Sequence, residues 1–348
     1  MGGAEKVVLD LAQGLRRLHG EDLACAVNRG QLADAMRAAG IPVTEIYLRK
    51  SATGLTLYRL AQICRSWKPQ LIHSHHRYST FLLDLFFKTQ IPILHTEHVL
   101  RHDKKGLFRY GSFATAVHQT VADNLKLEYG VPKDCLEVIP NAVPAREADL
   151  AALEQLQKKH PRNRGEIFAV CIGRLEEQKG HTYLIDAVSR MTPRVRERLR
   201  IFFLGDGSLE APLQAQALSQ GVSRMFVFAG HTASVSEYLA LCDFMVLPSL
   251  WEGMPLSVLE AYGMEKPVLA TDIPGTRELV ARGLTGDLVP VRDPEALAKR
   301  LEAWVSAPER LGAMGDAAGQ RWRNEYSFDV MVSRYRSLYM RLIAQGKS

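Results

Sequence analysis

The segment Pro248-Ser249-Leu250-Trp251-Glu252-Gly253-Met254-Pro255-Leu256-Ser257-Val258-Leu259-Glu260-Ala261 decides the fold that we expect for this chain. It follows Met245-Val246-Leu247, an apolar run with strand character that Pro248 ends. Gly253 and Pro255 mark the turn into a helix, because proline is tolerated in the first helical turn, where its missing N–H costs nothing. The segment is therefore predicted to form a strand end, a loop and the first turns of a helix.

Two carboxylates lie eight residues apart in this segment. Glu252 falls in the predicted loop, beside helix N-terminal amides that suit an anion or a polar ligand. Glu260 falls about five residues into the helix, roughly 7 to 8 Å along its axis. Together they could hold two hydroxyl-rich parts of one elongated ligand, and an activated sugar is our interpretation. The alternative is a pair of ordinary surface carboxylates, since this spacing often occurs by chance.

The rest of the chain alternates strands and helices, which is typical of parallel sheets in α/β proteins. A chain of 348 residues is long enough for two domains, each with its own core. The polar stretch 146–164 fits a link between them. We predict one Rossmann-like domain at 1–163, with the linker from about 145, a second at 164–327, and a closing helix within 328–348.

The predicted strands end in polar residues, and open α/β sheets bind ligands at the carboxyl ends of their strands. In the first domain we expect strands at 24–27, 43–48, 70–73, 91–96, 113–117 and 136–139. In the second domain we expect them at 167–173, 199–205, 225–230, 244–247, 267–271 and 285–289. Helices are expected after Gly2-Gly3 and at 31–39, 55–67, 183–191, 209–220, 235–241, 294–307, 309–325 and 328–344.

The composition, 47% hydrophobic and 24% charged, is that of an ordinary globular protein. No run approaches the ~18 apolar residues of a membrane span, and the N-terminus does not resemble a signal peptide, so we expect a cytoplasmic protein. The five cysteines have no paired spacing. Neither a disulfide framework nor a metal site is therefore expected.

The positive charge of the chain lies in its first part. Residues 1–163 contain 22 Lys and Arg against 16 Asp and Glu, whereas residues 164–348 contain 22 of each class. This asymmetry predicts an anionic partner, a membrane surface or a phosphorylated acceptor rather than nucleic acid. The stretch 98–110 mixes cations with apolar and aromatic residues, as a surface that touches anionic lipid would, although a plain exposed loop is the alternative.

Two glycine-containing loops follow predicted strands of the second domain. Gly173-Arg174-Leu175-Glu176-Glu177-Gln178-Lys179-Gly180 offers close backbone approach and two cations, as a diphosphate requires. Gly205-Asp206-Gly207 is a similar turn at the next strand end. The alternatives are a solvated charged loop for the first and a common glycine turn for the second.

Eight motifs in chain order resemble those of the retaining glycosyltransferases of family 4, also known as glycosyltransferase group 1, which have the GT-B fold. The motifs are Gly2-Gly3-Ala4-Glu5, His73-Ser74-His75, Thr96-Glu97-His98, Val138-Ile139-Pro140-Asn141-Ala142, Gly173-Arg174…Lys179-Gly180, Gly205-Asp206-Gly207, Ser249…Glu252-Gly253-Met254-Pro255…Glu260-Ala261 and Thr271-Asp272-Ile273-Pro274-Gly275-Thr276-Arg277-Glu278. The resemblance implies two Rossmann-like domains with parallel sheets that face each other across a cleft. It also implies that the C-terminal helix returns to the N-terminal domain.

The resemblance further implies which residues bind the donor. Arg174 and Lys179 would neutralise the donor diphosphate, Glu252 would hold hydroxyls of the transferred sugar, and Glu260 would accept hydrogen bonds from the ribose. His98 would reach over the sugar from the N-terminal domain, and with Glu252, Lys179 and Arg174 it completes the expected catalytic set. Further donor-side candidates are Gly2, Gly3, Gly205, Gly207, Gly253, Met254, Pro255 and Leu256.

The acceptor side is expected in the basic N-terminal domain. Its candidates are His73, His75, Arg101, Lys104 and Lys105, and strand-end packing is the alternative for the two histidines. The implied activity moves a sugar from a UDP- or GDP-linked donor to a cell-surface glycan or lipid-linked acceptor, with retention by same-face attack. No metal and no cofactor are implied, and the protein would lie in the cytoplasm or on the inner face of the cell membrane.

One feature departs from the family pattern. In the family a strand precedes the glycine pair, whereas here Met1 stands directly before Gly2-Gly3. A missing central strand would leave buried backbone groups unpaired. We therefore expect either that the true start lies upstream or that the product is compromised. The rival functions are a nucleotide-sugar-binding protein with little transferase activity and another GT-B enzyme, such as a nucleotide-sugar epimerase.

Overall fold

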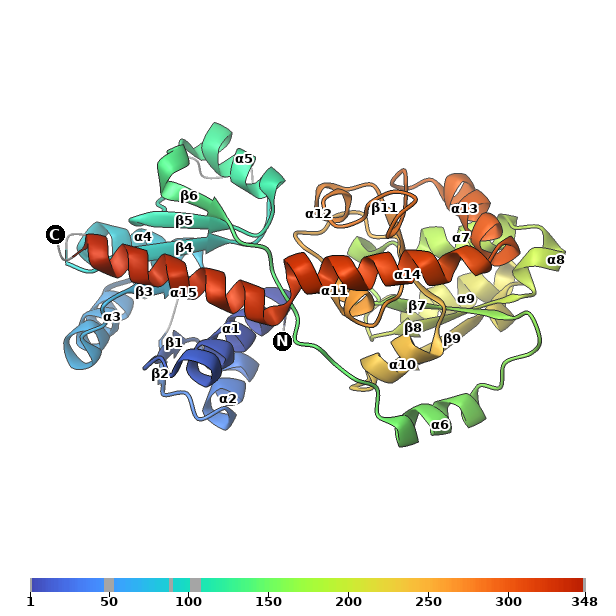
Figure 1. The fold of residues 1–348 in the computed structure, drawn as a ribbon, viewed down its shortest axis with the longest axis horizontal. Helices are drawn as coiled ribbons and strands as arrows, with labels where there is room; N and C mark the ends of the chain where they lie inside the picture. Colours follow the sequence, from blue (N-terminus) through green and yellow to red (C-terminus); the bar gives the residue numbers. More distant parts are fainter. Residues whose placement is uncertain (1, 47–52, 88–89, 101–107, 347–348) are drawn as a thin grey trace. The chain divides into compact units, whose positions relative to one another are not determined.

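The computed structural model describes residues 2–46, 53–87, 90–100 and 108–346 (Figure 1). The chain divides into unit 1, Met1–Pro144 with Phe328–Ser348, and unit 2, Ala145–Ser327. The predicted division at residue 163 differs, because the stretch expected as a linker belongs to unit 2. Its helix α6 (Leu150–Lys159) packs against α10 (Val235–Leu241), and Glu237 accepts a hydrogen bond of 2.9 Å from the Asp149 amide.

The described part of unit 2 contains one six-stranded parallel sheet in the order β12-β11-β10-β7-β8-β9. Its strands are β7 (Ile167–Ile172), β8 (Leu199–Leu204), β9 (Phe226–Gly230), β10 (Phe244–Leu247), β11 (Val268–Thr271) and β12 (Gly286–Val289). The chain builds outward from β7 to β9 and then returns to the other side of β7 with β10. This reversal creates a topological switch point between β7 and β10, where open α/β sheets bind ligands.

The strands of unit 2 are almost continuous apolar runs, as expected for a parallel sheet that helices cover on both faces. The side chains of Phe168, Phe202, Phe203 and Phe244 are fully buried. The covering elements are α7 (His181–Arg190), α8 (Pro193–Arg196), α9 (Glu210–Ser219), α10, α11 (Leu256–Gly263), α12 (Pro274–Arg277), α13 (Pro294–Ser306) and α14 (Glu309–Arg321). Short helical turns lie at η4 (Glu177–Lys179), η5 (Ser223–Met225) and η6 (Trp322–Tyr326).

Unit 1 contains two parallel sheets in its described residues, β1-β2 and β3-β4-β5-β6, which do not pair with each other. The strands are β1 (Cys25–Val27), β2 (Val43–Glu45), β3 (Ile72–Ser74), β4 (Ile93–Glu97), β5 (Phe113–Ala116) and β6 (Leu136–Val138). The helices are α1 (Gly3–His19), α2 (Gln31–Ala38), α3 (Thr53–Trp67), α4 (Arg77–Phe87), α5 (Gln119–Tyr129), the short η3 (Lys133–Cys135) and α15 (Phe328–Gln345). No ranges were predicted for α4 and α5 from the sequence.

The last helix, α15, is part of unit 1 and runs beside β3 to β6 (Figure 1). The hydroxyl of buried Tyr335 lies 3.3 Å from Thr96 Oγ1 and 3.4 Å from Thr115 Oγ1, so the helix contacts β4 and β5. It also packs against α1, since a Cβ atom at Gly14 would lie 2.5 Å from Val332 Cγ2. Glycine at this position therefore allows the first and last helices to approach closely.

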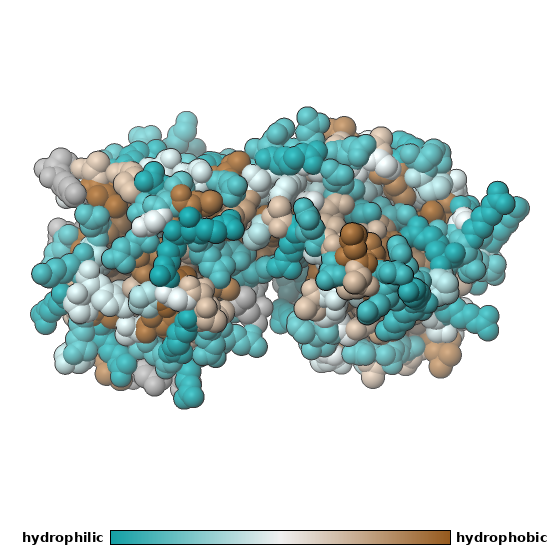
Figure 2. Space-filling model, turned by 60° about the horizontal axis from the view of Figure 1, so that its bottom comes forward, coloured by the Kyte–Doolittle hydropathy of each residue, from teal (hydrophilic) through white to brown (hydrophobic). Residues whose placement is uncertain are grey.

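Hydrophilic residues cover most of the face drawn in Figure 2, and apolar side chains appear there as scattered groups. Such scattered apolar exposure is ordinary for a folded protein. Among the described residues, no helix combines the length and the apolar composition that crossing a membrane requires.

Candidate functional site

The candidate site of unit 2 is built from loops that follow β7, β8, β10 and β11. These loops lie at the carboxyl ends of their strands, and the loops after β7 and β10 flank the switch point. Because neighbouring parallel strands end at the same edge, residues far apart in sequence are brought together here. The predicted donor residues from Gly173 to Gly180 and from Glu252 to Glu260 all belong to these loops or to the helices that follow them.

Backbone contacts join the loops after β7 and β10. The amide of Leu250 donates to the Gln178 carbonyl at 2.8 Å, and the Gln178 side chain donates to the Trp251 carbonyl at 2.9 Å. Gly180 has a φ of 65°, and a Cβ atom there would lie 2.1 Å from the Pro248 carbonyl oxygen. Glycine is therefore required at 180 both by conformation and by space.

Lys179 and Glu252 form an ion pair between these two loops. Lys179 Nζ lies 2.6 Å from Glu252 Oε1, and the side chains are only 16% and 9% exposed. The Ser249 hydroxyl donates to the same oxygen at 2.8 Å. A ligand that enters this site thus meets a cation and a carboxylate that already neutralise each other.

Arg174 is exposed, and its guanidinium has no hydrogen bond or ion pair with any part of the chain that the structure describes. The neighbouring Glu176 is used differently. Its carboxylate accepts from the amide and hydroxyl of Ser208, at 3.0 and 2.9 Å, and these bonds lower its pKa. Glu176 therefore ties the loop after β7 to the loop after β8, which leaves Arg174 as the cation available to a ligand.

Gly205 and Gly207 have a clear packing role. A Cβ atom at Gly205, whose φ is 139°, would lie 2.2 Å from the Gly173 carbonyl oxygen, and one at Gly207 would lie 2.4 Å from that of Leu175. Two backbone hydrogen bonds, from Leu175 to Asp206 and from Leu209 to Leu175, close the same contact. The two glycines let the loops after β7 and β8 touch, and direct contact with a ligand stays a prediction for both.

The segment Glu252-Gly253-Met254-Pro255-Leu256 leads into α11, which begins at Leu256. Pro255 precedes the helix with an extended ψ of 112°, and Met254 is buried. Glu260 is the fifth residue of the helix and is half-buried. The structure thus places both carboxylates in the same unit, Glu252 in the loop and Glu260 within the helix.

In unit 1 three of the predicted histidines form a cluster at the carboxyl ends of β3 and β4. The rings of His73 and His75 are tilted by 39° with their centroids 4.0 Å apart, and His75 Nδ1 lies 3.1 Å from His98 Nε2. His98 Nδ1 is buried and has no hydrogen-bond partner among the described residues. Because the other ring nitrogen is engaged by His75, Nδ1 is the atom that His98 can offer to a ligand.

All three histidines of this cluster are held neutral. Burial lowers the pKa of His73 and His75 well below the ordinary value, and neighbouring histidines lower both further. Burial also lowers the pKa of His98 to about 4, against the opposing charge of Glu97. His98 can therefore exchange hydrogen bonds with a polar ligand near neutral pH, but it does not supply positive charge.

His73 also has a packing role that the sequence analysis raised as an alternative. Its Nδ1 lies 2.6 Å from the Tyr339 hydroxyl and its Nε2 lies 2.6 Å from Thr96 Oγ1. Both ring nitrogens are therefore used within unit 1, which links β3 to β4 and α15. Tyr339 was not predicted, because it lies 266 residues from His73 and no local pattern connects the two.

The ion pair between Arg77 and Glu97, next to His98 in the sequence, was also not predicted. Arg77 binds Glu97, and its guanidinium lies over the rings of Phe108 and Tyr129, 4.8 and 4.4 Å from their centroids. Burial would raise the pKa of Glu97, but His95 and Arg77 lower it to about 2. The Thr96-Glu97-His98 motif thus combines a structural carboxylate with the candidate histidine.

The remaining predicted residues fall into two groups. Gly2 and Gly3 lie in unit 1 at the start of α1, where the Gly2 amide donates to Glu5 Oε2 at 2.7 Å. The predicted acceptor-side residues Arg101, Lys104 and Lys105 lie outside the described residues. Within the described residues, no group of three or more His, Cys, Asp or Glu side chains is arranged to hold a metal ion.

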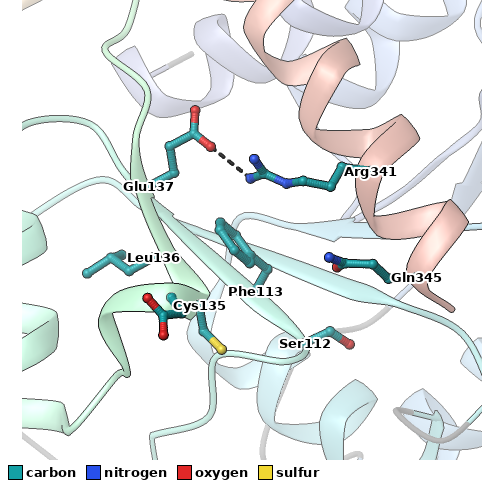
Figure 3. A pocket seen from close by; sticks show the side chains of 8 residues that line it. Ser112, Phe113, Cys135, Leu136, Glu137, Arg341 and Gln345 are labelled. Carbon is teal, nitrogen blue, oxygen red and sulfur yellow. Dashed lines mark hydrogen bonds and ion pairs between the residues drawn. The ribbon is translucent and has the colours of Figure 1, made fainter.

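A separate pocket of about 400 Å³ lies in unit 1 at the amino ends of β5 and β6 (Figure 3). Phe113, Glu137 and Arg341 are among the residues that line this pocket. Arg341, from α15, donates a hydrogen bond of 2.9 Å to Glu137, and the Arg341 guanidinium lies 5.3 Å from the Phe113 ring centroid. The histidines lie at the opposite, carboxyl ends of the strands. This pocket is therefore distinct from the candidate site of unit 1.

Two family models match most of the chain. The model described as Glycosyltransferase Family 4 matches residues 1–147, and the model described as Glycosyl transferases group 1 matches residues 153–321. A D-inositol 3-phosphate glycosyltransferase of Geodermatophilus obscurus is 27% identical over 276 residues, which are 70% of this chain and 61% of that protein. The lipopolysaccharide core biosynthesis mannosyltransferase LpcC of Rhizobium leguminosarum bv. viciae is 26% identical over 247 residues, 69% of this chain and 64% of that protein.

Solved structures show the same architecture. Anabaena HepE in complex with UDP matches with a TM-score of 0.84 at 19% identity, over 97% of this chain and 96% of that chain. The same protein in complex with UDP-glucose matches with a TM-score of 0.79. At this identity the likeness shows a shared fold. The chain spans only part of its relatives' length. The match covers 51%, 61% and 61% of three curated relatives, the last of which is the D-inositol 3-phosphate glycosyltransferase.

Proposed function

Because the chain belongs to the group 1 glycosyltransferases with family 4 N-terminal domains and has the GT-B fold, we propose that it transfers a sugar from a nucleoside-diphosphate sugar to an acceptor hydroxyl. In this proposal unit 2 binds the donor, and unit 1 supplies His98 and contacts the acceptor. The GT-B fold was predicted from the sequence and is confirmed.

One observation carries the proposal: Lys179 and Glu252 meet at the switch point between β7 and β10. A nucleoside-diphosphate sugar has an anionic diphosphate next to a hydroxyl-rich ring. Lys179, with exposed Arg174 in the same loop, matches the diphosphate, and Glu252 matches the hydroxyls. The site thus offers a cation for the diphosphate and a carboxylate for the sugar hydroxyls.

The proposed mechanism uses these groups as fixed charges. Cleavage of the anomeric bond places positive charge on the sugar and negative charge on the leaving diphosphate. Arg174, Lys179 and the nearby helix N-termini would stabilise the diphosphate without a metal ion. The acceptor would attack from the face that the diphosphate leaves, and a phosphate oxygen would take its proton, so that the anomeric configuration is retained.

We further propose a UDP- or GDP-linked donor and a cell-surface glycan or lipid-linked acceptor. Solved complexes of HepE with UDP and with UDP-glucose support a UDP-linked donor. The similarity to LpcC, a lipopolysaccharide core biosynthesis mannosyltransferase, supports a cell-surface acceptor. A protein that transfers sugars to such acceptors would act in the cytoplasm or on the inner face of the cell membrane. The positive charge of residues 1–163 is consistent with an anionic acceptor or membrane surface.

The test is a thermal-shift screen with UDP-, GDP- and ADP-sugars, since a ligand that binds only the folded state raises its stability. The best donor is then incubated with candidate acceptors, with and without EDTA, and the anomeric configuration of the product is determined by NMR. We expect EDTA-resistant transfer with retention. Binding without transfer would support a nucleotide-sugar-binding protein, and conversion of the donor sugar without an acceptor would support an epimerase.

A further inference from the structure

We propose that Ser249 is a positioning residue that holds one oxygen of Glu252, and that Thr271 positions Ser249, so that Glu252 presents its other oxygen, Oε2, to the donor sugar. The inference rests on the function proposed above, because it takes Glu252 as the residue that contacts the sugar. It gives a role to the Thr271–Glu278 motif, to which the sequence analysis assigned no function.

The two oxygens of the Glu252 carboxylate have different surroundings. Oε1 accepts from Lys179 Nζ at 2.6 Å and from Ser249 Oγ at 2.8 Å, which satisfies its usual capacity for two hydrogen bonds. Oε2 has no hydrogen bond to any of the described residues. It is therefore the oxygen with free capacity for a sugar hydroxyl.

A further hydrogen bond holds Ser249 in place. The residue is fully buried, and its carbonyl accepts a hydrogen bond from the Thr271 hydroxyl at the end of β11. Thr271 is 3% exposed, and its carbonyl accepts from Thr276, which is fully buried. The contacts run from Thr276 through Thr271 and Ser249 to Glu252, and buried hydrogen bonds of this kind restrict the positions of the groups that they join.

The segment 271–276 also contacts the residue that follows Glu252. Gly275 lies so close to the Gly253 carbonyl oxygen that a Cβ atom there would come within 2.0 Å of it. The segment 271–276 thus contacts the backbone of both Ser249 and Gly253, before and after Glu252. Its contacts fix the loop that carries the carboxylate.

Lys179 and Ser249, which both donate hydrogen bonds to Glu252 Oε1, have different roles in this proposal. Lys179 is a long, flexible cation that the proposed function also assigns to the diphosphate. Ser249 is fully buried, so it stays bonded to Glu252 when Lys179 turns toward a phosphate. Ser249 therefore keeps Oε2 directed at the ligand throughout binding.

The test compares ligands that differ only in the sugar. The probes are UDP-glucose with UDP and GDP-mannose with GDP, and the pair that binds the wild-type chain is used. Ser249→Ala should weaken binding of the nucleotide sugar or lower kcat roughly 10-fold, as loss of a hydrogen bond to a charged group does, and leave the affinity for the nucleoside diphosphate within about twofold. Ser189→Ala, which removes a hydroxyl that bonds only within α7, is the control and should change neither.

A second pair of variants tests Thr271. Thr271→Val removes the hydroxyl that reaches Ser249 and keeps the side-chain shape, and it should reproduce the selective loss. Thr271→Ser keeps the hydroxyl and should recover most of the lost activity. Equal loss in Val and Ser variants, or equal loss for the nucleotide sugar and the nucleoside diphosphate, would show a merely structural role and overturn the inference.

Glu252→Ala separates this inference from the proposed function. If Glu252→Ala abolishes transfer while Ser249→Ala and Thr271→Val behave as wild type, the positioning role is wrong and the proposed function stands. If Glu252→Ala is as active as wild type, the assignment of Glu252 to the sugar fails, and the inference fails with it.

Discussion

Lys179 and Glu252 are 73 residues apart in the sequence, yet Lys179 Nζ lies 2.6 Å from Glu252 Oε1. The contact forms because β7 and β10 are neighbours in the sheet of unit 2 and their following loops meet at one edge. Without a ligand the two charges neutralise each other. A diphosphate that binds Lys179 must therefore compete with Glu252, and the hydroxyls that bind Glu252 offset the weakened ion pair.

Substitution of either partner should affect both transfer and stability. Lys179→Met should lower kcat/KM roughly 100-fold or more, because a cation that stabilises the leaving group is lost. Glu252→Gln keeps the shape and removes the charge, and it should lower kcat by a comparable factor. Each single substitution should also reduce the free energy of unfolding, by up to about 3–5 kcal/mol, because the pair is largely buried and the remaining charge is left without its partner.

A double-mutant cycle checks this ion pair. The Lys179→Met, Glu252→Gln double variant should be destabilised less than the sum of the two single variants, because each single variant leaves one charge unpaired. Urea unfolding gives the free energies and steady-state kinetics gives the activities. Additive free energies would mean that the ion pair makes no net contribution to stability.

The loop glycines should tolerate substitution according to their surroundings. Gly205→Ala should destabilise unit 2 by about 2 kcal/mol or more, because the residue has a positive φ and its new Cβ atom would meet the Gly173 carbonyl. Gly312→Ala is the matched control, since Gly312 lies in helix α14 with nothing within 4 Å of a new Cβ atom. It should stabilise the protein by about 0.5–1 kcal/mol, as alanine does in a helix interior.

Thermal unfolding of both variants measures this difference, and UDP affinity adds a second comparison. Gly205→Ala should also weaken UDP binding, because it displaces the loop that carries Arg174. If Gly205→Ala unfolds at the wild-type temperature, the close approach between the two loops is wrong.

His181 should make the stability of unit 2 depend on pH. The residue is 2% exposed, and neither ring nitrogen has a hydrogen-bond partner among the described residues. Burial, with a smaller effect of Lys179, lowers its pKa to about 4. The unfolded chain takes up a proton as pH falls through about 6.5, whereas the folded chain does so only near pH 4. The contribution of His181 is therefore fully present above pH 6.5 and is lost as pH falls toward 4.

The expected size of this loss is at most about 3.5 kcal/mol, the equivalent of a pKa difference of about 2.5. His181→Leu removes the titrating ring and should unfold with a weaker dependence on pH between 6.5 and 4. Urea unfolding at several pH values, with fluorescence detection, measures both slopes. Equal slopes for wild type and variant would rule out this role of His181.

His98 should be required for transfer and dispensable for nucleotide binding. The described nucleotide-site candidates Arg174 and Lys179 belong to unit 2, whereas His98 belongs to unit 1. His98→Ala should lower kcat roughly 10- to 100-fold through the loss of a hydrogen bond to the reacting sugar. It should leave the UDP affinity unchanged by calorimetry, and a matched loss of UDP affinity would contradict the assignment.

The sequence predicted the features of this protein that depend on local patterns. The alternation of apolar runs and amphipathic helices predicted most strands of both units, and the glycines and prolines near Glu252 predicted the loop before α11. The structure divides the chain after residue 144, where the predicted linker begins, and the contact of the charged stretch with α10 places that stretch in unit 2. Neighbouring charges in a helix reveal little about what the helix packs against.

Contacts between distant residues could not be predicted in the same way. Gly205 and Gly207 looked like ligand-binding glycines, and the structure gives them a role in packing one loop on another. The Ser249 and Thr271 hydroxyls carried no pattern that distinguishes a positioning residue from an ordinary buried one. Their contacts depend on the strand order, which places the loops after β10 and β11 side by side.

The sequence by itself thus determined the family, the α/β architecture and the identity of the charged residues in the candidate donor site, because these depend on local periodicity and on short motifs. Only the tertiary structure decided that Lys179 and Glu252 neutralise each other and that one oxygen of Glu252 is occupied. The physical reason is that strand order, which brings loops 73 residues apart into contact, is set by the packing of the whole sheet and not by any one segment.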